Sequence, residues 1–121
     1  MAISRETRAA VYAKCGGRCG YCGIVLDTIK AMQVDHIQPK QFRGTDDFEN
    51  LMPACRSCNN YKTVFSVEEF RRMVSQQVEL LRRYATNYRH AERFGLVKAT
   101  VPERIVFYFE QPLRQPEKDH P

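Results

Sequence analysis

The sequence predicts an α+β protein built around a small strand–loop–strand–helix unit that two cysteine pairs hold together. Two Cys-x-x-Cys pairs, Cys19 with Cys22 and Cys55 with Cys58, are separated by 32 residues. Between them, residues 31–37 and 48–52 predict two short strands on either side of a turn at residues 44–47. Prolines at positions 39 and 53 should limit these strands, and residues 59–62 should begin a short helix.

Helices are predicted on both sides of this unit. Ser4 can cap a helix over residues 4–14, which Gly16 and Gly17 end. Ser66 and Glu69 have the spacing of a capping box and open a long amphipathic helix that Gly95 closes. Its apolar stripe predicts core packing, whereas the arginines of its other face suit either solvent or a phosphate backbone. Residues 105–109 are β-branched and aromatic, which predicts a C-terminal strand or a buried extended segment.

Length and charge limit the classes of protein. The 121 residues suit a single domain, 1–112, followed by a flexible proline-containing tail, 113–121. The net charge of +5 suits an anionic partner such as nucleic acid, and equally a mildly basic soluble protein. No apolar run approaches the roughly 20 residues of a membrane span, and the first residues lack an apolar signal core. We therefore expect a cytoplasmic protein with no membrane partner.

The cysteines predict a structural metal. Thiols stay reduced in the cytosol, so paired cysteines there indicate metal ligands before disulfides. Cys19, Cys22, Cys55 and Cys58 have the spacing of a tetrahedral Zn²⁺ site, against the alternative of two unrelated thiol pairs. Four thiolates fill the zinc coordination sphere, so any chemistry needs a second centre. Cys15 is too far from the pairs in sequence to join them and is interpreted as a spare thiol.

The second centre is expected at Asp35 and His36. Carboxylate and amide oxygens suit Mg²⁺ or Mn²⁺, and a neutral imidazole can take a proton from water near pH 7. This combination suits phosphodiester hydrolysis. Consecutive strand residues point to opposite faces, so a bend or a bound metal would be needed to gather the two side chains. A half-buried structural histidine and a turn aspartate are the alternative interpretation.

Three separate elements then carry a resemblance. Val34-Asp35-His36-Ile37-x-Pro39, Asn50-Leu51 and Cys55-x-x-Cys58-Asn59-x-x-Lys62 resemble the HNH endonuclease family in its zinc-stapled ββα-metal (His-Me finger) form, over residues 19–62. The resemblance implies that His36 is the general base, that Asp35 is a metal ligand and that Asn50 holds the loop that orients His36. Asn59 stands where many members carry histidine, so the chain is similar to the His-Asn-Asn subtype, with Asn59 as the second Mg²⁺ ligand. Asn60 is the fallback ligand.

The same resemblance implies an endonuclease that nicks DNA or cuts both strands, with RNA open as a substrate. It would use structural Zn²⁺ and catalytic Mg²⁺ or Mn²⁺, act as a monomer or homodimer, and be encoded by a bacterium or a phage. By the resemblance, Lys62 and Arg56 would face phosphates. Arg8 could do so from its place on the helix of residues 4–14, and simple solvent exposure is an alternative for each of the three. A non-catalytic zinc-knuckle nucleic-acid-binding module and a redox or zinc sensor are the competing functions. The Asp35-His36 pair favours the nuclease over the binding module, which does not need it. A redox or zinc sensor instead predicts thiols that are oxidised reversibly while nucleic acid stays intact.

Overall fold

The computed structural model describes residues 3–112 and divides into two compact units. The first unit holds the residues up to Val64 together with the segment from Val106, and the second is Phe65–Ile105. The predicted single domain, 1–112, thus contains two such units, and the predicted flexible tail, 113–121, lies outside the described residues. Between residues 3 and 112, no helix has the length and apolar character that a bilayer crossing requires.

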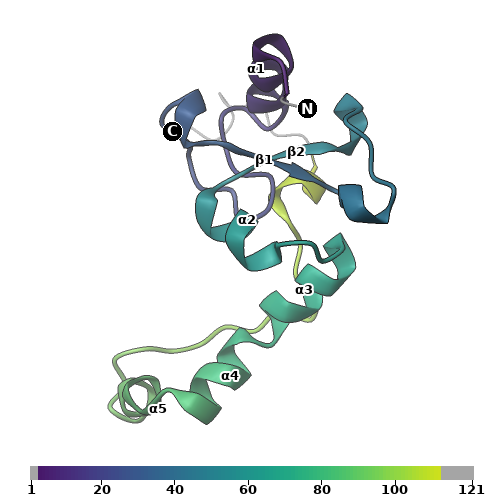
Figure 1. Ribbon diagram of the computed structural model, residues 1–121. Helices are drawn as coiled ribbons and strands as arrows, with labels where there is room; N and C mark the ends of the chain where they lie inside the picture. Colours follow the sequence, from purple (N-terminus) through teal and green to yellow (C-terminus); the bar gives the residue numbers. More distant parts are fainter. Residues whose placement is uncertain (1–2, 113–121) are drawn as a thin grey trace. The chain divides into compact units, whose positions relative to one another are not determined.

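The first unit is organised by a two-stranded antiparallel sheet (Figure 1). Strand β1 (Gln33–His36) pairs with β2 (Leu51–Ala54), with Asp35 opposite Met52 and His36 opposite Leu51. The predicted strands therefore exist, but β1 begins two residues later than expected and β2 begins three residues later, because residues 48–50 form a 3₁₀ turn. Three 3₁₀ turns flank or connect the strands: η1 (Ile29–Ala31), η2 (Lys40–Phe42) and η3 (Phe48–Asn50).

Pro53 lies inside β2 rather than at its limit, which corrects the sequence prediction. The amide of Ile37 donates to the carbonyl of Asn50 at 2.9 Å, and hydrogen-bonded and non-bonded pairs alternate along an antiparallel ladder. Pro53, opposite Val34, therefore occupies a non-bonded position where its missing N–H breaks no ladder bond. Its carbonyl faces away from β1 and accepts a 2.7 Å bond from the amide of Gly20.

Two helices lie on either side of this sheet. Helix α1 (Arg5–Lys14) begins after Ser4, whose Oγ accepts the amide of Thr7, as predicted. Helix α2 (Arg56–Lys62) follows β2 directly, starting earlier than residue 59, and gives the strand–strand–helix order. Helix α1 packs against β2 and α2 against β1 (Figure 1). The core of this unit contains Val11, Leu26, Met32 and Leu51. The α+β class and the ββα arrangement are confirmed.

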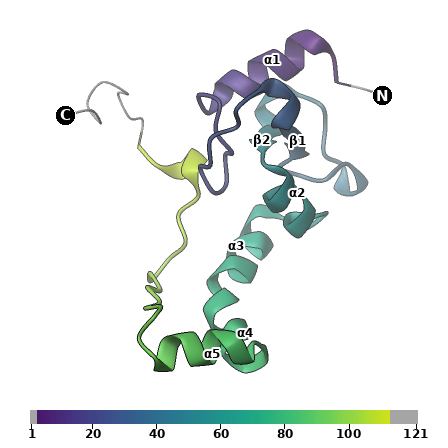
Figure 2. The same ribbon diagram turned by 90° about the vertical axis from the view of Figure 1, so that its left-hand side faces the viewer.

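The second unit contains three helices where the sequence predicted one long helix, so that prediction is wrong. They are α3 (Val67–Ser75), α4 (Gln77–Tyr84) and α5 (Thr86–Arg93), and α4 and α5 pack side by side (Figure 2). The breaks fall at Gln76 and at Ala85, whose backbone is extended. The capping box of Ser66 and Glu69 is confirmed, as is the closure at Gly95, which has φ of +73°.

The predicted C-terminal strand is also wrong. Residues 105–109 add no strand, and Tyr108–Glu110 form a 3₁₀ turn, η4. The amides of Tyr108 and Phe109 donate to the carbonyls of Tyr21 and Gly20, at 3.0 and 2.8 Å. Phe107 is buried with its ring edge-on to Tyr21. The aromatic pattern thus signalled burial against the first cysteine pair and not a place in the sheet.

Candidate functional site

Four cysteines from two segments converge in the first unit. The sulfur atoms of Cys19, Cys22, Cys55 and Cys58 all lie within 4.8 Å of one another. The Sγ atoms of Cys22 and Cys55 are 3.8 Å apart. A tetrahedral tetrathiolate site with bonds of about 2.3 Å has sulfur–sulfur edges of about 3.8 Å. The cluster therefore has the donors and the spacing of a closed four-cysteine metal site, and Cys15 lies outside it.

The backbone shapes each half of this cluster. The amide of Tyr21 donates to Cys19 Sγ at 3.4 Å, and the amide of Cys58 donates to Cys55 Sγ at 3.3 Å. Such bonds favour the thiolate form that binds metal. Gly20 approaches β2 so closely that any side chain there would collide with the strand. Glycine at this position therefore permits the close contact between the first cysteine pair and β2.

The charge balance of the cluster tests its fit to a cation. The hydrogen bond from the Cys58 thiol lowers the pKa of Cys19 to about 4. Burial raises the pKa of Cys22 to about 11, and the bond to Cys19 together with burial raises the pKa of Cys58. The negative charge of Cys19 thus opposes ionisation of Cys22 and Cys58. A divalent cation supplies the positive charge that four thiolates require, so the residues fit the predicted site.

Asp35 points from β1 into the interior and is only 5% exposed. Its Oδ2 accepts a 2.6 Å hydrogen bond from the Tyr21 hydroxyl and lies 3.1 Å from Lys62 Nζ. Burial and the charge of Asp35 raise the pKa of Tyr21, so its hydroxyl stays protonated and donates. Lys62 Nζ also lies 3.3 Å from the His36 carbonyl oxygen. The carboxylate is thus held by a buried ammonium and by a hydroxyl from the first cysteine pair.

The three residues predicted to face phosphate differ in their surroundings. Lys62 has no exposed surface, so the expected phosphate contact does not fit its position. Arg56 is exposed at the first turn of α2. The Arg8 guanidinium is partly buried and donates to the carbonyls of Ile29 and Met32, both at 3.2 Å. The phosphate roles of Arg56 and Arg8 stay predictions.

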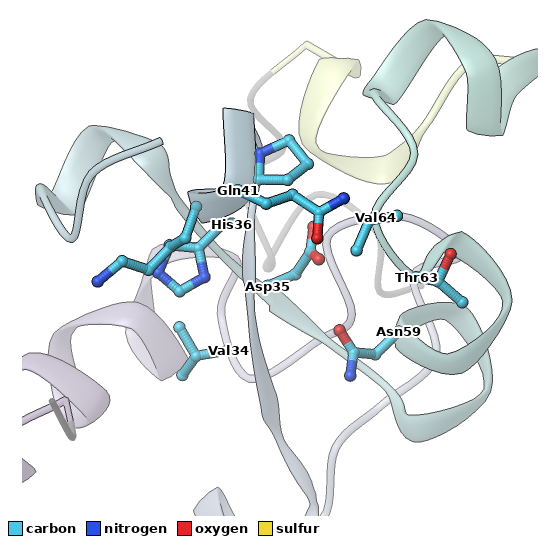
Figure 3. A pocket seen from close by; sticks show the side chains of 9 residues that line it. Val34, Asp35, His36, Gln41, Asn59, Thr63 and Val64 are labelled. Carbon is cyan, nitrogen blue, oxygen red and sulfur yellow. The ribbon is translucent and has the colours of Figure 1, made fainter. Parts of the chain in front are cut away.

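His36 leaves β1 on the other side from Asp35, as strand alternation predicts (Figure 3). Its Nε2 lies 2.7 Å from Asp46 Oδ1, and Lys40 Nζ lies 3.1 Å from Asp46 Oδ2. The hydrogen bond to His36, followed by that to Lys40, lowers the pKa of Asp46. Sequence reasoning placed Asp46 only in a turn, because no spacing pattern links it to His36.

Asn50 closes the loop between the strands. Its Oδ1 accepts the amide of Gln38 at 2.8 Å, and its Nδ2 donates to the carbonyls of Gln38 and Thr45, at 3.1 and 2.7 Å. These bonds join both ends of the loop that carries Asp46. The contacts agree with the loop-holding part expected of Asn50, and its effect on His36 stays a prediction.

A cavity of about 320 Å³ brings the remaining candidates together. Its walls include Asp35, His36 and Asn59, with Asp35 and His36 on the strand and Asn59 on α2 (Figure 3). The fallback residue Asn60 is exposed and does not line the cavity. A carboxylate and an amide oxygen are donors that Mg²⁺ and Mn²⁺ accept. Asp35 and Asn59 therefore fit a hard cation. The Lys62 ammonium already contacts one oxygen of the Asp35 carboxylate.

Two antiparallel strands and a helix form a ββα unit. Its four cysteines could hold a metal ion, and a carboxylate, a histidine and an amide line a cavity nearby. Residues 19–65 match the family described as HNH endonuclease.

A similar protein is the "SPbeta prophage-derived putative HNH endonuclease YoqL" of Bacillus subtilis (strain 168), which is 35% identical over 60 residues. The match covers 44% of this chain and 26% of YoqL, so the chain spans about a quarter of that relative's length.

Proposed function

We propose that the protein is a metal-dependent endonuclease that hydrolyses phosphodiester bonds in DNA. One observation carries this proposal: Asp35, His36 and Asn59 line a single cavity within the segment that matches the HNH endonuclease family. The net charge of +5 supports an anionic polymer as the substrate. The prophage origin in the name of the similar protein supports a bacterial or phage gene and a cytoplasmic site of action.

Two kinds of metal site would serve this function. Cys19, Cys22, Cys55 and Cys58 would hold Zn²⁺ with all four positions filled, so this ion is structural. Asp35 and Asn59 would hold Mg²⁺ or Mn²⁺ through their oxygens. When bound, the second cation polarises the phosphate and stabilises the leaving oxygen.

His36 is the general base in this mechanism. Asp46 holds one ring nitrogen at 2.7 Å, which fixes the ring and leaves the other nitrogen to take a proton from the attacking water. Asn50 keeps the loop that carries Asp46 closed through its bonds to Gln38 and Thr45. The exposed Arg56 contacts a backbone phosphate.

Residues 3–112 carry one such set of residues, which is sufficient for nicking one strand. A double-strand cut requires two copies, as a homodimer would supply. The alternative function, a non-catalytic nucleic-acid-binding module, shares the basic charge and the cysteine cluster but has no use for a base at His36.

Cleavage of supercoiled plasmid with and without Mg²⁺ tests the proposal. His36→Ala should lower the cleavage rate at least about 100-fold, the usual contribution of a positioned base, while zinc content stays at wild-type level. His90→Ala is the matched control. His90 is exposed in the second unit, where its ring stacks on that of Phe94, and it does not line the cavity. Undiminished cleavage by His36→Ala would remove the base assignment, and DNA binding without any cleavage by wild type would favour the binding module.

A further inference from the structure

Tyr21 joins the two candidate metal sites. It lies between Cys19 and Cys22 in the first cysteine pair, and its hydroxyl donates at 2.6 Å to Oδ2 of Asp35. The Tyr21 side chain is 3% exposed, so water does not compete for this bond. A residue of the structural cluster thus contacts the carboxylate expected to bind the catalytic cation.

We propose that Tyr21 is a positioning residue that fixes the Asp35 carboxylate for the catalytic cation and so couples the four-cysteine site to the nuclease site. The inference rests on the proposed function only in taking Asp35 as a ligand of Mg²⁺ or Mn²⁺. Tyr21 itself does not touch substrate or cation.

The first step is the division of labour between the two oxygens of Asp35. Oδ2 is engaged twice, by the Tyr21 hydroxyl and by Lys62 Nζ at 3.1 Å. Within residues 3–112, no hydrogen bond or ion pair reaches Oδ1. The terminal torsion of aspartate is broad when it is unrestrained. Two partners on one oxygen stop that rotation and leave Oδ1 as the single oxygen for a cation.

This division favours a particular kind of cation. A carboxylate that offers one oxygen suits Mg²⁺ or Mn²⁺, which take few protein ligands and keep several waters. Ca²⁺ often takes both oxygens of one carboxylate. The Tyr21 bond therefore supports the smaller cations at Asp35.

The second step is the anchoring of Tyr21 itself. Its ring packs edge-on against Phe107 and Phe109, with centroids 5.2 and 5.9 Å away. The neighbouring amide of Gly20 donates to Pro53 at 2.7 Å. Because Cys19 and Cys22 would both bind the structural cation, the metal fixes the backbone on either side of the ring. The position of the hydroxyl is therefore set by the four-cysteine site.

The test compares Tyr21→Phe with Tyr12→Phe in zinc-loaded protein. Each change removes one tyrosine hydroxyl that makes a 2.6 Å bond, in one case to Asp35 and in the other to the carbonyl of Leu26. Mn²⁺ binding is measured by electron paramagnetic resonance, and the Mg²⁺ dependence of plasmid cleavage is measured alongside. Tyr21→Phe should raise the Mn²⁺ Kd about tenfold, the lower end of the usual effect of removing a bond that orients a ligand. Tyr12→Phe should leave it unchanged.

The kinetics separate positioning from general damage. Loss of positioning raises the Mg²⁺ concentration needed for half-maximal cleavage, while cleavage at saturating Mg²⁺ largely recovers. Simple destabilisation lowers maximal cleavage without moving that concentration. A Mn²⁺ Kd for Tyr21→Phe within twofold of wild type overturns the inference, as does a wild type that binds no Mn²⁺ at the cavity. A wild type that binds Mn²⁺ through Asp35 without cutting DNA overturns the proposed function and leaves the positioning inference intact.

A measurement on the unaltered protein guards against a variant that fails to fold. The buried Tyr21 hydroxyl proton should give a slowly exchanging NMR signal, because it is enclosed and hydrogen-bonded. Addition of Mg²⁺ should shift that signal if Asp35 binds the cation. An unshifted signal at saturating Mg²⁺ contradicts the coupling.

Discussion

Replacing Lys62 with methionine should destabilise the first unit strongly. Lys62 has no exposed side-chain surface, and its ammonium lies 3.1 Å from the 5%-exposed carboxylate of Asp35. Methionine fills most of the same volume, so the main loss is the charge. Breaking a buried ion pair from one side leaves an uncompensated buried charge, which costs about 3–5 kcal/mol. The Tyr21 hydroxyl still donates to Asp35 in this variant, which favours the lower part of that range.

Lys40→Met supplies the matched control. Lys40 also pairs with an aspartate, Asp46, at 3.1 Å, but these side chains are 53% and 37% exposed. An exposed pair of this kind contributes about 0–1 kcal/mol. Both substitutions therefore remove a lysine ammonium from an ion pair with the same N–O distance. The two ion pairs differ in how deeply they are buried.

Denaturant unfolding at a buffered free Zn²⁺ concentration measures both variants. Zinc release to a chromogenic chelator reports on the unit that carries the cysteines, independently of the helices of Phe65–Ile105. The double variant Asp35→Asn/Lys62→Met should regain part of the loss, because no buried charge remains. A Lys62→Met protein within about 1 kcal/mol of wild type would refute the assignment of Lys62 and Asp35 as a buried pair.

Two further predictions concern metal and pH. Cys58→Ser, or removal of zinc by a chelator, should unfold the first unit, because zinc binding contributes on the order of 10 kcal/mol in such sites; a folded, zinc-replete Cys58→Ser protein would contradict the four-thiolate site. The bond to His36 and then that to Lys40 hold the pKa of Asp46 below its ordinary 3.8. The stability from this contact is therefore present above about pH 4 and is lost as pH falls through the folded pKa. Carboxyl ¹³C NMR should show that His36→Ala raises the Asp46 pKa.

The local parts of the fold were predictable because their signals are local. Ser4 and Ser66 cap helices by bonding amides three residues along the chain, so the sequence alone contains both partners. The cysteine spacing predicted the cluster for a similar reason, since metal ligation restricts which spacings work. The helix caps, like each of the two cysteine pairs, therefore depend on residues within one short stretch of sequence.

The prediction of one long helix failed because the helical spacing of apolar residues continues across the breaks between α3, α4 and α5. Neither Gln76 nor Ala85 is a residue that usually ends a helix, and neither glycine nor proline stands nearby. The turn between α4 and α5 is supported by contacts that cross it. Arg82 pairs with Glu92 at 2.8 Å, and the Arg89 guanidinium donates to the carbonyls of Arg82 and Arg83. Side chains distant in sequence thus compete with the continuous helix.

The candidate site shows the same division between local and distant causes. Asp35, His36 and Asn59 could be selected from their residue types and from the resemblance to the HNH endonuclease family, whereas their partners could not. Lys62 was expected to face a backbone phosphate, with solvent exposure as the alternative, because its buried partner is not visible in the sequence and lysine is seldom fully buried without one. Its partner is Asp35, which was itself predicted to bind a cation. The two residues were therefore given separate roles, and their ion pair was not predicted. A buried ammonium on the oxygen that a metal does not use resolves the conflict: Lys62 and Tyr21 hold Oδ2, and Oδ1 stays available to the cavity.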